Sequence, residues 1–243
     1  MLSAVLFDFN GTLIRSGPWM ELEVRRLPQA ALTRLAEQGH IPAPDAALLA
    51  RADETFRALR QRANRIGNET SHVQDLASIL ADVSLGGNIS YDLIESTVAD
   101  LHRKCLPTVE LLPGAAYALR RLSALGLRLS ILSNAAYPPF LAWTLERFEL
   151  AGFFEDVVVS ADVSWRKPRP EIFRLALERL GLSPDETVYV GDDFEKDVAT
   201  PKRLGMRAIW FRPQSPAAEP AREVEADAVV TTLDEIPGWV ERW

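Results

Sequence analysis

Six short runs rich in aliphatic and aromatic residues constrain the fold most, because helical patterns separate most of them. Near-continuous apolar strands of this kind are typical of a parallel sheet that helices cover on both faces. The sequence therefore predicts an α/β protein with a Rossmann-like, doubly wound parallel sheet. The predicted strands are residues 4–7, 127–132, 157–159, 187–190, 208–211 and 228–230.

Helices are expected between these strands, at about residues 114–125, 138–150, 170–180 and 195–204. A glycine follows each of them and is predicted to end it in the left-handed conformation. These glycines are Gly126, Gly152, Gly181 and Gly205. The last two helices each join two strands, as right-handed crossover units do.

The pattern changes between residues 14 and 106, where no convincing strand is found and the periodicity is helical. Apolar residues recur three and four positions apart from Leu49 to Ile66 and again from Leu76 to Val83. The predicted organisation is a sheet domain of residues 1–14 and 107–243 that carries a helical insert of residues 15–106.

Charge and cysteine content exclude several classes of partner and site. With 27 basic and 34 acidic residues, the net charge is −7, which disfavours nucleic acid and anionic membranes as partners. The single cysteine, Cys105, excludes an intrachain disulfide or a multi-cysteine metal site, and we expect it to be buried. The apolar start is too short for a membrane span and lacks signal-peptide features, so a cytoplasmic location is expected. The oligomeric state stays open.

Arginines crowd one part of the insert, and this pattern has two interpretations. The first is a solvated helix face, which is the usual explanation of a charge run. The second is an anion-selecting surface. The arginines are Arg51, Arg57, Arg60, Arg62 and Arg65. Residues 213–220, rich in proline and alanine, are expected to form an exposed loop before the last strand.

Polar residues that can carry chemistry follow the predicted strands. Asp8 opens the segment Asp8-Phe9-Asn10-Gly11-Thr12, and Ser133-Asn134 follows the second strand. Lys167 precedes a proline-rich turn, and Gly191-Asp192-Asp193 ends the fourth strand, with Asp197 a little further on. Because ligands bind at the carboxyl ends of parallel strands, we expect these residues to converge on one site.

The residue types in this set suit phosphoryl transfer. Asp8 and Asp192 offer the hard oxygen ligands that Mg²⁺ prefers. A carboxylate can also attack phosphorus and form an aspartyl-phosphate. Lys167, the Ser133 hydroxyl, the metal and backbone amides near Gly11 are the expected sources of charge stabilisation.

These motifs, in this order, resemble those of the haloacid dehalogenase-like (HAD) hydrolase superfamily, in the subgroup with a helical cap inserted after the first motif. The resemblance covers nearly the whole chain. It implies a HAD-like catalytic core and a cap of residues 15–106, with Mg²⁺ as the cofactor and a small-molecule phosphate ester as the partner.

The resemblance also implies roles for individual residues. Asp8 would be the nucleophile and a metal ligand, Asn10 would bind the metal through its backbone carbonyl, and Asp192 would be a further ligand. Asp193 and Asp197 would support the metal. Catalysis would involve Asp8, Asn10, Ser133 and Lys167, and the substrate-binding set would be Thr12, Ser133, Asn134 and Lys167.

Asn10 departs from the family pattern, since phosphatases of this superfamily usually carry an aspartate two residues after the nucleophile. An amide forms hydrogen bonds but does not exchange a proton, and positioned acid-base catalysis contributes about 10² to 10⁴ in rate. The leading hypothesis is a Mg²⁺-dependent phosphatase for a small phosphorylated metabolite. The alternatives are a phosphotransferase or hydrolase of reactive phosphates, and a catalytically weak metal- and phosphate-binding regulatory protein. Dehalogenation fits poorly, because that branch works without a metal.

Overall fold

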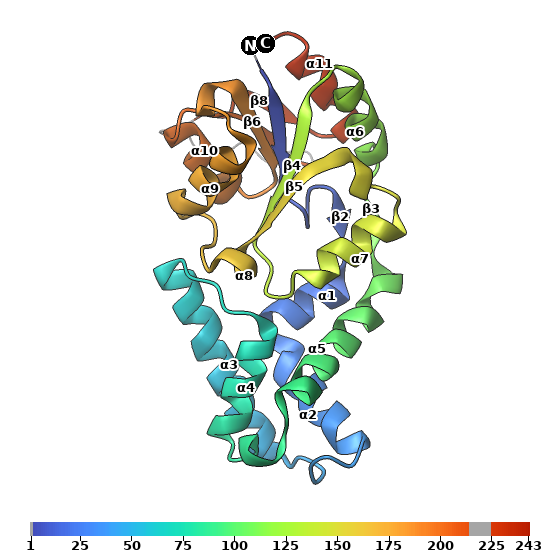
Figure 1. Ribbon diagram of the computed structural model, residues 1–243, viewed down its shortest axis with the longest axis vertical. Coiled ribbons are helices and arrows are strands. Elements are labelled where there is room, and N and C mark those ends of the chain that lie inside the picture. The colour runs from blue at the N-terminus through green and yellow to red at the C-terminus, as the bar shows by residue number, and fades with distance from the viewer. Residues whose placement is uncertain (1, 214–224) are drawn as a thin grey trace. The chain divides into compact units, whose positions relative to one another are not determined.

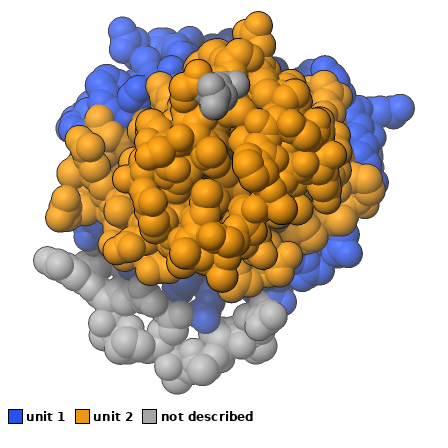
Figure 2. Space-filling model, turned by 90° about the horizontal axis from the view of Figure 1, so that it is seen from below, with its two compact units in different colours: residues 1–15, 110–134, 145–243 blue, residues 16–109, 135–144 orange. Residues whose placement is uncertain are grey.

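The computed structural model describes residues 2–213 and 225–243, and these divide into two compact units (Figure 2). Unit 1 comprises Met1–Arg15, Glu110–Asn134 and Leu145–Trp243, and unit 2 comprises Ser16–Val109 and Ala135–Thr144. Residues 135–144, assigned above to the sheet domain, thus cluster with the insert. Of the expected loop at 213–220, only Pro213 lies within the described residues.

A six-stranded parallel sheet forms the centre of unit 1 and confirms the predicted fold class. The spatial order is β5-β4-β1-β6-β7-β8, and every neighbouring pair is parallel. Because β1 lies between β4 and β6, residues that follow these three strands emerge at one edge of the sheet. The strands are β1 (Ala4–Phe7), β4 (Arg128–Ser133), β5 (Phe154–Val159), β6 (Thr187–Gly191), β7 (Arg207–Phe211) and β8 (Ala228–Val230).

Helices of unit 1 lie on opposite sides of this sheet (Figure 1). On one side lie α6 (Ala115–Ala124) and α11 (Ile236–Val240), and on the other α9 (Pro170–Leu180) and α10 (Thr200–Arg203). The buried face of α9, including Ile172 and Phe173, packs in one apolar cluster with Leu6 of β1 and Tyr189 of β6. A short helix, α8 (Ser160–Val163), follows β5.

Two helix predictions differ in detail from the structure. The segment predicted as one helix at 195–204 begins as a π-helical turn, Phe194–Ala199, before α10. After α7 (Pro139–Arg147), the left-handed residue is Glu149, with φ of 57°, and not the predicted Gly152. The other three predicted glycines do adopt positive φ.

Unit 2 is helical, as the periodicity of the insert predicts. Its helices are α1 (Gly17–Glu21), α2 (Leu27–Glu37), α3 (Ala46–Ile66), α4 (His72–Asp82) and α5 (Tyr91–Cys105), with a π-helical turn at Leu22–Arg26. Side chains cap three of these helices: Asp45 caps α3, Ser90 caps α5, and Ser71 forms a capping box with Gln74 at α4. Cys105 is buried, as expected.

A short antiparallel pair not predicted from the sequence lies where the chain leaves and re-enters unit 1. It consists of β2 (Ile14–Arg15) and β3 (Glu110–Leu111). Two residues per strand give no readable periodicity. No helix among the described residues is long and apolar enough to cross a membrane.

The arginines of α3 separate into two groups. Arg60 is buried and pairs with Glu69 and Asp75, at 2.9 Å in each case. The other four are exposed, which agrees with a solvated helix face and gives no indication of a built anion site.

Candidate active site

Three neighbouring strands deliver the predicted catalytic residues to one edge of the sheet. Asp8 follows β1 directly, Ser133 is the last residue of β4, and Asp192 follows β6. Asp8 and Ser133 are buried, with 8% and 2% of their surfaces exposed, and Asp192 is exposed. The sequence prediction that these residues converge is therefore supported by the strand order.

Lys167 is the centre of the site, although it lies on a loop and not on a strand. Its Nζ donates hydrogen bonds to Oδ1 of Asp8 at 2.7 Å, to Oδ1 of Asp197 at 2.7 Å and to the Tyr189 hydroxyl at 2.8 Å. An ammonium has three donors, so all of them are used. Only 2% of the residue is exposed, and the cation is thus held in a fixed place beside the Asp8 carboxylate.

Electrostatics keep this lysine charged. Burial by itself lowers the pKa of Lys167, but the negative charges of Asp197 and Asp8 outweigh it and raise that pKa well above its usual range. Burial also raises the pKa of Asp197, which shares the ammonium with Asp8. The two buried carboxylates thus share one positive charge, which leaves a negative excess at the site.

Asn134 fixes the backbone of Lys167 from the end of β4. Its side-chain nitrogen donates to the Lys167 carbonyl, and its side-chain oxygen accepts from the Lys167 amide, both at 2.8 Å. The carboxamide, predicted to bind substrate, is therefore engaged in positioning the lysine.

The loop after Asp8 is shaped by one glycine. Gly11 has φ of +95°, and a Cβ there would lie 2.4 Å from Oδ2 of Asp192. Only glycine allows both the backbone conformation and the close approach of the carboxylate. The Gly11 amide donates to the Ile14 carbonyl at 2.8 Å and so closes the loop on itself. Asn10 forms a backbone bridge with Ile14 in the same loop.

Thr12 lies on the other side of the Asp8 carboxylate. Its hydroxyl is 3.4 Å from Oδ2 of Asp8, and the residue is fully buried. With Lys167 on Oδ1 and Thr12 near Oδ2, the carboxylate is held at both oxygens.

The acidic residues after β6 occupy distinct places. Asp193 caps the π-helical turn by accepting from the Lys196 amide, and its carboxylate pairs with the Lys196 ammonium. The Asp193 amide in turn donates to Oδ2 of Asp197 at 3.0 Å. Asp197 approaches the backbone so closely that a Cβ on Gly191 would lie 2.4 Å from it.

A divalent cation fits the carboxylates at this edge. Asp8, Asp192 and Asp197 each offer an oxygen, and these oxygens lie within 4.8 Å of one another. Partial burial of its carboxyl, and then the charge of Asp8, raise the pKa of Asp192 to about 6. Carboxylates that disfavour each other's ionisation are stabilised by a cation between them, and all-oxygen donors suit Mg²⁺.

Tyr189 belongs to the site but was not predicted from the sequence. Its hydroxyl accepts from Lys167 and donates to the Leu132 carbonyl at 2.7 Å, and it is fully buried. Because Tyr189 lies inside an apolar strand, the sequence pattern indicates only an aromatic residue of the core. A buried tyrosine needs a hydrogen-bond partner, and that requirement was the available signal.

The fold and the site together define a hydrolase of the HAD type, and the comparison with protein families agrees. The family model for haloacid dehalogenase-like hydrolases matches residues 2–205. The chain belongs to this family.

Among curated proteins, the chain is similar to glyceraldehyde 3-phosphate phosphatase of Methanocaldococcus jannaschii, at 28% identity over 86% of this chain and 84% of the relative. It is also similar to phosphoglycolate phosphatase of Rhodospirillum rubrum, at 29% identity over 99% of this chain and 91% of the relative.

Among solved structures, the chain resembles 2-haloacid dehalogenase from Pseudomonas syringae, with a TM-score of 0.72, 25% identity and full coverage of both chains. It also resembles a HAD phosphatase from Thermococcus onnurineus, with a TM-score of 0.62, 26% identity and 98% coverage of both. Phosphatases and dehalogenases thus share this architecture, so the side chains of the site have to decide between the reactions.

Proposed function

We propose that this chain is a Mg²⁺-dependent phosphatase that acts on a small phosphorylated metabolite through an aspartyl-phosphate on Asp8. The observation that carries the proposal is the carboxylate cluster around one buried ammonium. Lys167 supplies one positive charge to Asp8 and Asp197, so these two carboxylates together with Asp192 keep a negative excess that a metal would balance. A carboxyl nucleophile for a reaction without metal needs no such additional acid.

The metal would be held by Asp8 and Asp192, with the Asn10 backbone carbonyl as a third ligand and Asp197 in support. When bound, it supplies charge neutralisation that lets an anionic carboxylate approach an anionic phosphate. Asp193 is engaged with Lys196, so we assign it to holding the turn that carries Asp197.

In the first step, an oxygen of Asp8 attacks phosphorus and the bond from phosphorus to the ester oxygen breaks. The alcohol leaves with a proton from solvent or from a donor on the substrate, because Asn10 cannot give one. In the second step, water attacks the phosphorus of the aspartyl-phosphate. Inorganic phosphate leaves, one proton is released, and the Asp8 carboxylate is restored.

The remaining residues orient the reactants. Lys167 holds Oδ1 of Asp8 and offers its charge to the transferring phosphoryl group, and Ser133 provides a hydroxyl from the neighbouring strand end. Tyr189 and Asn134 are positioning residues that act through Lys167. Thr12 fixes the second oxygen of Asp8 and lies where a phosphoryl oxygen would arrive.

We further propose that residues 15–106 are the family's cap and select the substrate. The helical composition of unit 2, and its place after β1 in the chain, support this assignment. The names of the relatives indicate short phosphorylated acids, aldehydes and sugars as the first substrates to try.

Asn10 favours a second candidate, a phosphotransferase or hydrolase of reactive phosphates. A good leaving group departs without a proton, and the reaction then needs no acid at position 10. For this second candidate the rate rises steeply as the pKa of the leaving group falls. A rate that does not depend on that pKa contradicts the second candidate.

The test measures phosphate release from glyceraldehyde 3-phosphate, phosphoglycolate, phosphoserine and acetyl phosphate, with Mg²⁺ and with chelator. We expect Mg²⁺-dependent turnover that disappears in Asp8→Asn. The matched control is Asp185→Asn, since Asp185 is exposed before β6, and it should retain full activity. Turnover that persists in Asp8→Asn would refute the assigned nucleophile.

A further inference from the structure

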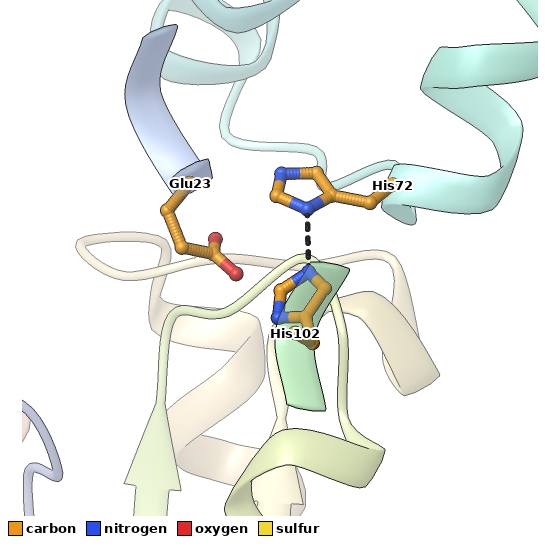
Figure 3. Close-up of side chains that lie close together, drawn as sticks. All are labelled: Glu23, His72 and His102. Atoms are coloured by element: carbon orange, nitrogen blue, oxygen red, sulfur yellow. Dashed lines mark hydrogen bonds between the residues drawn. The ribbon is translucent and has the colours of Figure 1, made fainter. Parts of the chain in front are cut away.

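Unit 2 contains a second buried polar cluster that the phosphatase chemistry does not use. Glu23 comes from the π-helical turn, His72 is the first residue of α4, and His102 lies in the last turn of α5 (Figure 3). Their exposed fractions are 8%, 0% and 0%. Three helical segments thus bring one carboxylate and two imidazoles together inside the unit.

The two rings face each other through one nitrogen each. Nδ1 of His72 and Nε2 of His102 lie 3.0 Å apart, as the dashed line in Figure 3 shows. The outer nitrogens, Nε2 of His72 and Nδ1 of His102, have no hydrogen-bond partner within the described part of the chain. An ion between the inner nitrogens would replace the hydrogen bond that joins them.

The rings are held rigidly and without charge. His102 stacks on Tyr137, with ring centroids 4.4 Å apart. Burial lowers the pKa of His72 well below its usual range and that of His102 to about 3, so both rings are neutral at neutral pH. Neutral imidazole is the form that binds metals.

Nearby charge does not exclude a cation. The positive charge of Arg60 helps to lower the pKa of His72, but this arginine is compensated by both Glu69 and Asp75. The Glu23 carboxylate adds a negative charge directly at the cluster.

The distances agree with a metal-binding set. One ligand atom from each of Glu23, His72 and His102 lies within 4.8 Å of the other two. Zinc binds imidazole nitrogen at about 2.0–2.1 Å, so two nitrogens in a tetrahedral site lie roughly 3.3 Å apart. This is close to the 3.0 Å between Nδ1 of His72 and Nε2 of His102. The second carboxylate oxygen of Glu23 accepts from the Ala136 amide at 3.0 Å and so orients the group.

We propose that Glu23, His72 and His102 form a binding site for a divalent transition metal of the zinc class, inside unit 2. Two imidazoles and one carboxylate, with a water as the fourth ligand, suit zinc, whereas Mg²⁺ prefers oxygen alone. The chain then carries two metal sites of different chemistry, the oxygen site at the sheet edge and this nitrogen-rich one. The proposal stands independently of the proposed phosphatase function.

The experiment refolds the full chain with Zn²⁺ or Co²⁺ while excess Mg²⁺ occupies the carboxylates, and then measures the metal retained after desalting. We expect about one equivalent of zinc, and for cobalt the intense visible absorption of a four-coordinate site. Refolding removes the problem of access, because the site forms around the ion. Retention of less than a tenth of an equivalent would overturn the proposal.

Variants localise the ion. His102→Asn and Glu23→Gln should each lower zinc affinity at least tenfold, whereas the control His40→Asn should not change it, because His40 is exposed. Equal retention in all three variants contradicts the assignment.

A measurement on the unmodified chain covers the case in which His102→Asn fails to fold. Zinc should shift the ring ¹⁵N resonances of two of the three histidines and leave His40 unchanged. Unchanged resonances of His72 and His102 overturn the site.

Discussion

Two buried polar clusters in the described part of the chain differ in how their charges are compensated. At the sheet edge of unit 1, Lys167 lies among Asp8, Asp197 and Tyr189, and every donor of its ammonium is used. The cluster in unit 2 consists of the Glu23 carboxylate and two neutral imidazole rings, with no positively charged side chain among its members. The first cluster carries its own cation and is preorganised for an anionic reaction, whereas the second is arranged to receive a cation.

The largest effect is expected when the built-in cation is removed. Lys167→Met leaves two buried carboxylates without their cation, which should destabilise the fold by about 3–5 kcal/mol and abolish phosphate release. Urea unfolding and a phosphate assay measure both. The control is Lys202→Met, because Lys202 pairs with Asp227 in a partly exposed bridge and should cost at most about 1 kcal/mol. A Lys167→Met protein with ordinary activity would show that the site in unit 1 does not depend on its own cation.

Gly11→Ala tests how closely the carboxylate cluster is packed. The new Cβ would lie 2.4 Å from Oδ2 of Asp192, whereas ordinary contact begins at 3.4 Å. The carboxylate must therefore move by about 1 Å, which should lower kcat/KM about 10²-fold. Gly126→Ala separates contact from backbone strain, since Gly126 also has positive φ but has no atom within 4 Å of its Cβ. It should lose only about 1 kcal/mol of stability, with unchanged kinetics. Equal kinetic losses in the two variants would contradict the packing argument.

Asn10→Asp adds the carboxyl that the family usually has at this position. Restored acid-base catalysis should raise the hydrolysis of phosphate esters tenfold or more, measured as kcat. A gain limited to substrates with poor leaving groups would show that the missing acid limits departure of the leaving group. No change, or a loss, means that position 10 is not an impaired acid-base position.

The smallest effect is expected for Tyr189→Phe, because a neutral hydroxyl is lost while the charges remain. Stability should fall by about 1–2 kcal/mol, and kcat should change only a few-fold. Tyr117→Phe, at an exposed tyrosine, is the matched control and should change neither quantity. A loss of activity as large as that of Lys167→Met would make Tyr189 more than a positioning residue.

The sequence predicted the strands of the sheet well because each is a continuous apolar run, and Asp8, Ser133 and Asp192 could be recognised because they follow such runs. Tyr189 was not recognised, since the same apolar pattern conceals a hydroxyl that is important only once Lys167 is placed beside it. The cluster of Glu23, His72 and His102 has no local signature, because its members come from three helical segments. The two-residue pair β2 and β3 was too short for any periodicity.

Contacts between distant segments also explain why the unit boundaries in the structure differ from the predicted domain boundaries. Residues 135–144 follow the strand β4 in sequence, and sequence order alone assigns them to the sheet domain. In the structure they pack with unit 2, where the Ala136 amide and carbonyl bind Glu23 and the His72 amide. Contacts between distant segments decide this assignment, and a local pattern does not contain them.

Detection of the phosphorylated residue tests whether Asp8 is the nucleophile. The chain is mixed with acetyl phosphate and Mg²⁺, quenched in acid and mapped by peptide mass spectrometry. Because the amide of Asn10 cannot take a proton from the attacking water, we expect one phosphoryl group to accumulate on Asp8, with less in the Asn10→Asp variant and none in Asp8→Asn. A phosphoryl group on any other residue would contradict the account, and so would turnover without a phosphoenzyme in both the unmodified chain and the Asn10→Asp variant.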